Sequence, residues 1–105
     1  MSLLDEIREL LAAPMAANSQ PLLERFDETL TAGYAYALQL EAERWRAERR
    51  LGEVASHIAQ RSDQERVEEL TELAKRLDES SEEITALRTL LVSLRDRRRE
   101  LRQAA

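Results

Sequence analysis

The sequence predicts an all-α protein: a short N-terminal helix, then two long helices paired as an antiparallel coiled-coil hairpin. Only 2 Gly and 2 Pro interrupt the 105 residues. The remainder is rich in Ala, Leu, Glu and Arg, which have the highest helix propensities. Apolar residues also recur in alternating steps of three and four, the pattern of a coiled-coil seam. This length and an aromatic content of 4% indicate a single domain without a broad globular core.

Residues 1–13 are predicted to form a short amphipathic helix. Ser2 is suited to cap its start. Pro14 ends it, because proline disfavours the helical conformation of its predecessor. Residues 14–20 are expected to be a linker. The apolar positions at helical spacing are Leu3, Leu4, Ile7, Leu10 and Leu11.

The hairpin is expected to span residues 21–105, with helices at about 21–60 and 63–103. Asn18 or Ser19 is suited to cap the first long helix, and Pro21 is tolerated in its first turn. The first seam consists of Leu23, Phe26, Leu30, Gly33, Ala37, Leu40, Arg44, Ala47, Leu51, Val54 and Ile58. The second consists of Leu70, Leu73, Leu77, Ser80, Ile84, Leu87, Leu91, Leu94, Arg98 and Leu101.

A turn is predicted near residues 61–63, although neither Gly nor Pro lies there. Continuing the first seam past Ile58 reaches only charged residues, so its phase breaks. Ser62 and Glu65 match a capping box at a new helix start. The alternative is one continuous helix that pairs only with other chains.

An antiparallel register centred on Ser62 places small residues of the first long helix opposite large ones of the second, which fills a seam without voids. These pairs are Ala47 with Leu77, Ala37 with Leu87, and Gly33 with Leu91; Arg44 faces Ser80. Ion pairs are expected for Glu41 with Arg88, Glu43 with Arg76, and Arg50 with Glu69. The arginines of residues 95–102 are expected beside Glu24, Asp27 and Glu28.

The residue types give little support for catalysis, a cofactor or a metal site. There is no cysteine, and His57 is the only histidine. With Glu53 one turn before it, His57 supplies too few ligands for an ordinary zinc site. We therefore expect no enzyme, no cofactor and no metal. A small all-helical enzyme, similar in size to chorismate mutases, is a minor alternative.

The net charge of −5 argues against phosphate as the main partner. Of the 16 basic and 21 acidic residues, five and two lie in residues 95–105, leaving 11 and 19 for the rest. A regulatory nucleic-acid-binding protein using this basic helix end is the alternative function. Acidic residues near the N-terminus fit neither a signal peptide nor a membrane span. We expect a cytoplasmic protein without membrane association, and the high arginine content suggests a bacterial source.

Apolar residues outside the seam favour a protein–protein interaction module, either self-associating or acting as an adaptor or scaffold. A homodimer in a four-helix arrangement is expected, with helix 1 available to another protein. The alternative is a monomeric bundle in which helix 1 docks on its own hairpin. The outline resembles small flagellar-type secretion chaperones in its long antiparallel helices alone. The interaction candidates are Leu3, Leu4, Ile7, Leu10, Leu11, Tyr34, Leu38, Trp45, Leu90 and Val92.

Overall fold

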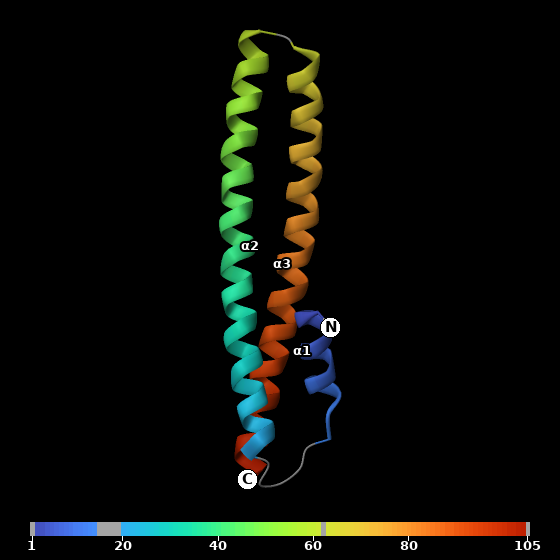
Figure 1. Ribbon diagram of the computed structural model, residues 1–105, viewed down its shortest axis with the longest axis vertical. Coiled ribbons are helices and arrows are strands. Elements are labelled where there is room, and N and C mark those ends of the chain that lie inside the picture. Colours follow the sequence, from blue (N-terminus) through green and yellow to red (C-terminus); the bar gives the residue numbers. More distant parts are fainter. Residues whose placement is uncertain (1, 15–19, 62, 105) are drawn as a thin grey trace. The chain divides into compact units, whose positions relative to one another are not determined.

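The protein is built from three helices, as the computed structural model shows for residues 2–14, 20–61 and 63–104 (Figure 1). The helices are α1 (Leu3–Ala12), α2 (Gln20–Gln60) and α3 (Gln64–Ala104). No strand occurs in these ranges. The predicted all-α class is therefore confirmed, and α2 and α3 are arranged as a helical hairpin.

Helix α1 has the N-terminal cap and the C-terminal stop that its sequence predicts. The backbone N–H of Asp5 donates to Oγ of Ser2 (3.2 Å), which is the expected cap. Ala13 has extended backbone angles, φ −66° and ψ 141°, as the residue before proline prefers. The helix is shorter than the predicted 1–13 because Ser2 and Ala13 are its caps, and Met1 lies outside the described residues.

Helix α3 begins with a cap different from the predicted one. The N–H of Glu65 donates to Oδ1 of Asp63 (3.0 Å), and the N–H of Val67 donates to the Asp63 carbonyl (3.0 Å). Asp63 thus accepts the hydrogen bond from the Glu65 N–H, which the predicted capping box assigned to the side chain of Ser62. Ser62 lies outside the described residues, as do the other predicted caps, Asn18 and Ser19.

The chain divides into two units. The terminal unit comprises Met1–Ala37 and Thr85–Ala105, and the hairpin unit comprises Leu38–Ile84. The terminal unit contains α1 and parts of both long helices, whereas the hairpin unit contains parts of the long helices alone. This difference sets how thoroughly each unit buries its apolar residues.

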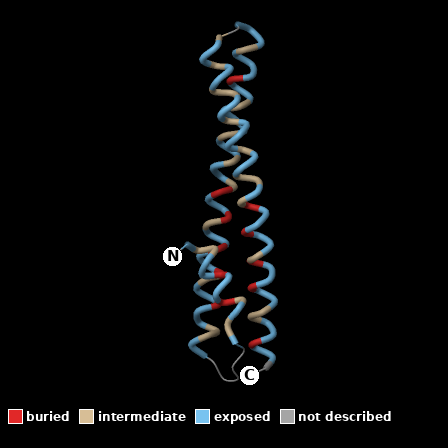
Figure 2. Tube along the Cα trace, turned by 90° about the vertical axis from the view of Figure 1, so that its right-hand side faces the viewer, coloured by how far each residue is buried: buried red, intermediate tan, exposed pale blue. Residues whose placement is uncertain are grey.

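The terminal unit has the better-buried core. Within it, a Cβ added to Gly33 would overlap Cδ2 of Leu91, which supports the predicted small-against-large layer. Leu91 is fully buried, so the absent side chain at Gly33 lets the two helices approach closely here. The buried apolar residues of this unit are Ile7, Leu10, Phe26, Leu30, Ala37, Leu87, Leu91, Leu94 and Leu101, among the segments drawn red in Figure 2.

The hairpin unit buries its seam less completely, because two helices cover only one side of each other. Leu40, Val54 and Ile84 are buried there. Arg44 is half-buried, with its Nε 3.2 Å from Oε1 of Glu48 on the next turn of α2. The other seam positions, Ala47, Leu51, Ile58, Leu70, Leu73, Leu77 and Ser80, are half-buried.

Glu69 joins the two helices near the turn of the hairpin unit. Nε of Arg50 lies 2.7 Å from its Oε1, which confirms the predicted pair, and Nη1 of Arg66 lies 2.8 Å from its Oε2. The hydrogen bond from Arg50, followed by that from Arg66, lowers the pKa of Glu69 below its ordinary value of 4.5. Arg76, predicted beside Glu43, has an ion pair with Glu72 at 3.6 Å.

The two glycines allow a matched test of the helix packing. Gly52 has open space around it, so Gly52→Ala is expected to stabilise α2 by about 1 kcal/mol through helix propensity. Gly33→Ala gains the same propensity but must displace buried Leu91, at a cost of about 1–3 kcal/mol. Urea unfolding should therefore place Gly33→Ala below Gly52→Ala. Equal gains at both sites would contradict the Gly33–Leu91 layer.

Glu69 gives the hairpin an acid-dependent contribution to stability. Its folded-state pKa is lowered, so its contribution is present above the ordinary value of 4.5 and is lost as the pH falls through the lower folded-state pKa. Glu69→Gln should thus be less stable than wild type at pH 7, and the difference should shrink below about pH 4. Glu68→Gln, an exposed neighbour, is the control. Urea unfolding across this pH range measures both; a difference independent of pH would refute the assignment.

Candidate interaction surfaces

Helix α1 docks on its own chain within the terminal unit, beside the C-terminal part of α3 (Figure 1). Ile7 and Leu10 are 0% and 1% exposed, and Leu3, Leu4 and Leu11 are half-buried. Nη2 of Arg97 also donates to the Ala13 carbonyl (3.4 Å), fixing the end of α1 to α3. Two of the five interaction candidates of α1, Ile7 and Leu10, are therefore already covered by the same chain, which corresponds to the docked alternative.

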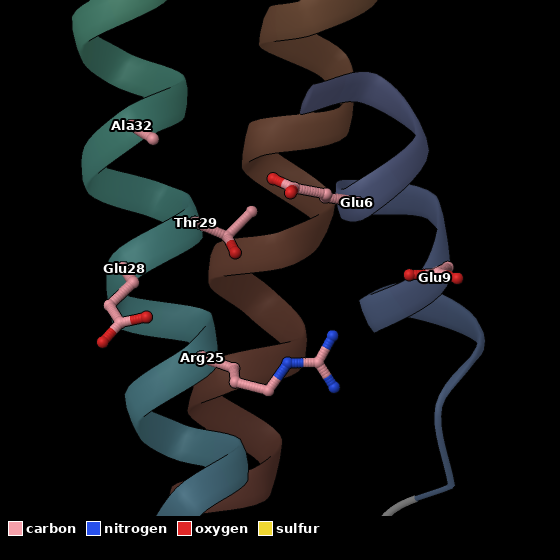
Figure 3. Close-up of a pocket in the computed structure, with 6 residues that line it drawn as sticks. All are labelled: Glu6, Glu9, Arg25, Glu28, Thr29 and Ala32. Carbon is pink, nitrogen blue, oxygen red and sulfur yellow. The ribbon is translucent and has the colours of Figure 1, made fainter. Parts of the chain in front are cut away.

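An open polar groove lies between α1 and α2 in the same unit. It is lined by Glu6, Glu9, Arg25, Glu28, Thr29 and Ala32 (Figure 3). Arg25 extends from α2 toward α1, whereas Glu28 points away from it (Figure 3). Three carboxylates against one guanidinium make the groove acidic. No sequence pattern predicts this groove, because it depends on where α1 docks.

No metal centre is formed by the described residues, in which no three His, Cys, Asp or Glu side chains are grouped suitably. His57 is exposed near the end of α2, and Glu53 is exposed one turn before it. Glu53 instead forms an ion pair with Arg50, 3.5 Å from Nη1. The histidine therefore has the environment of a solvated helical side chain.

The hairpin unit exposes large apolar side chains on the outer side of α2. Leu38 and Trp45 are 66% and 57% exposed. They are seven residues apart and so project from the same side of the helix. The guanidinium of Arg49 lies over the Trp45 ring, 4.9 Å from its centre, which is a cation–π contact. The i, i+4 spacing of Trp45 and Arg49 is the sequence signal for this contact.

The terminal unit exposes two further candidates. Tyr34 on α2 is 39% exposed, and Val92 on α3 is 46% exposed. Leu90 is half-buried, on the side of α3 that also carries Arg97. Leu90 thus belongs to the side of α3 nearest α1, while Tyr34 and Val92 lie elsewhere on the unit.

The C-terminal arginines separate into two groups. Arg98 pairs with Asp27 through Nε and Oδ1, as expected, and Arg97 contacts Glu100 (3.4 Å) besides Ala13. Arg95, Arg99 and Arg102 are exposed and have no ion pair with any part of the chain that the structure describes. From composition alone, the five arginines form a single basic cluster. The structure divides them because Arg97 and Arg98 face the neighbouring helices, whereas the other three do not.

Comparison of the chain with known protein families, with characterised proteins and with solved structures finds no match. Over residues 2–14, 20–61 and 63–104, no helix contains an apolar stretch long enough to cross a membrane. Function must therefore be argued from the surfaces themselves.

The docking of α1 can be tested by truncating its side chains. Ile7→Ala should lower the free energy of unfolding by about 2–5 kcal/mol, because the side chain is fully buried. Leu4→Ala, at a half-buried position of the same helix, should cost distinctly less. Chemical denaturation followed by circular dichroism measures both. Equal small losses would indicate that α1 is not packed on the unit.

Proposed function

We propose that the protein is a non-enzymatic helical interaction module that self-associates as a homodimer through coiled-coil packing. The observation that carries the proposal is the exposure of Leu38 and Trp45 on one side of α2. Large side chains grouped on a helix surface lose unfavourable contact with water when a second helix covers them. A second copy is the simplest partner, since it needs no other gene product.

The burial of α1 on its own chain limits which surfaces are left for association. Because Ile7 and Leu10 are buried on their own chain, α1 contributes to stability more than to partner binding. The proposed site of association is therefore on the long helices, beginning with the α2 surface that carries Leu38 and Trp45. An adaptor or scaffold role follows if the associated hairpins present their remaining surfaces to other proteins.

Nucleic-acid binding is the second candidate, favoured by the three arginines without ion pairs, Arg95, Arg99 and Arg102. The net charge of −5 opposes it, because most of the surface repels phosphate. Loss of binding at raised salt and on replacement of these arginines would be its signature.

Self-association can be tested by light scattering across a concentration series. The wild-type mass should approach that of two chains, and Leu38→Asp with Trp45→Asp should weaken association roughly tenfold or more. Gln39→Asp with Arg46→Asp, one position along the same helix, is the matched control. Fluorescence of Trp45, the only tryptophan, should shift to the blue on association as the indole leaves water. A strict monomer at every concentration would refute the proposal.

A further inference from the structure

One face of the terminal unit is left uncovered by α1. Helix α1 adjoins the side of α3 that bears Leu90 and Arg97, and the side of α2 that bears Arg25 and Thr29 (Figure 3). On α3, a row of exposed residues lies roughly 160° around the helix from Leu90. This row, termed the α3 outer stripe, consists of Arg88, Val92, Arg95, Arg99 and Arg102.

A matching row runs along α2, away from Thr29. This α2 outer stripe consists of Glu24, Asp27, Thr31 and Tyr34, all exposed. Both stripes advance by alternating steps of three and four residues, so each forms a straight edge suited to packing against another helix. Together they carry Tyr34 and Val92, the exposed large apolar side chains of this unit.

The two stripes have opposite charge. Arg95, Arg99 and Arg102 lack ion-pair partners among the described residues, and so does Glu24. Asp27 adds a second carboxylate, already in contact with Arg98. Basic side chains without partners on one helix thus accompany acidic ones on the other.

The stripes also agree in register when one is read antiparallel to the other. Placing Val92 opposite Tyr34 brings Arg95 opposite Thr31, Arg99 opposite Asp27 and Arg102 opposite Glu24. The apolar residues then share a layer, and two layers combine opposite charges. A parallel arrangement that aligns Val92 with Tyr34 would carry the charged ends of the stripes apart.

We propose that a second copy of this chain binds this face, with the α3 outer stripe of each copy packed antiparallel against the α2 outer stripe of the other. The arrangement is isologous, so both contacts form at once and four long helices surround one twofold axis. Val92 packs on the Tyr34 ring, while Arg99 and Arg102 pair with Asp27 and Glu24. This interface rests on the proposed self-association and adds to it a contact surface in the terminal unit, separate from the Leu38 and Trp45 surface of the hairpin unit.

The pairing of the stripes favours a second copy over a polyanion. A nucleic-acid backbone laid along the α3 outer stripe would lie close to the carboxylates of Glu24 and Asp27 on the neighbouring helix. Those carboxylates repel phosphate but attract the guanidinium groups of a second copy. Val92, in the middle of the stripe, also gains from an apolar partner and not from a phosphate.

Cross-linking tests the register directly, since the chain has no cysteine. A mixture of chains carrying Tyr34→Cys with chains carrying Val92→Cys should give a disulfide-linked dimer under mild oxidation. A mixture of Tyr34→Cys with Arg99→Cys, two turns away, should give much less. Because each cysteine is on a different chain, an intrachain disulfide is excluded. Equal yields from both mixtures would overturn the proposed register.

Charge reversal tests the same interface without oxidation. Arg102→Glu and Glu24→Arg should each weaken the dimer roughly tenfold, because like charges then meet twice across the twofold axis. An equimolar mixture of the two variants should regain wild-type affinity, since both contacts of the mixed dimer combine opposite charges. Light scattering and subunit exchange of labelled chains measure this. Only an intermolecular contact between these positions gives rescue on mixing.

The outcomes separate the inference from the function on which it rests. A dimer that shows neither the selective cross-link nor the rescue overturns this interface but leaves self-association intact. A monomer at every concentration overturns both. Salt-sensitive binding of a labelled DNA duplex by a monomeric chain, lost in the variant with Arg95, Arg99 and Arg102 changed to Glu, would also overturn it and assign the α3 outer stripe to nucleic acid.

Discussion

The close approach of α2 and α3 in the terminal unit depends on one unequal contact, Gly33 against Leu91. A buried leucine needs a space of its own size, and glycine provides it without a gap in the helix. The cost is the low helix propensity of glycine. That loss is tolerated here because neighbouring layers, including those of Leu87 and Leu94, are fully buried. The register of the remaining seam in this unit follows from this contact.

Two paired helices bury apolar residues on only one side of each helix. The two units differ in whether a further helix covers apolar residues outside this seam. The terminal unit covers one further side with α1, which buries Ile7 and Leu10. The hairpin unit has no third helix, and Leu38 and Trp45 stay exposed. The guanidinium of Arg49 covers part of the indole of Trp45, which is nevertheless 57% exposed.

Much of the fold was predictable because helix periodicity is a local property. The separation of α2 from α3, the Ser2 cap and the Arg50–Glu69 pair are each predicted correctly from residue type and spacing. The Asp63 cap was not, because Ser and Asp have similar capping propensities and only geometry separates them. The surfaces were harder to predict. Whether Leu10 is covered or free, and which arginines keep partners, depends on the docked position of α1, which periodicity does not encode.

The placement of α1 also affects how the chain folds as it is made. Residues 3–12 leave the ribosome before the part of α3 that carries Arg97, because they precede it by more than 80 residues in the chain. Until then the apolar face of α1 has no native surface to cover it, and α2 faces the same delay for most of its seam. Helix α1 is thus a late-closing element, because it can reach its buried position only after this part of α3 has been made.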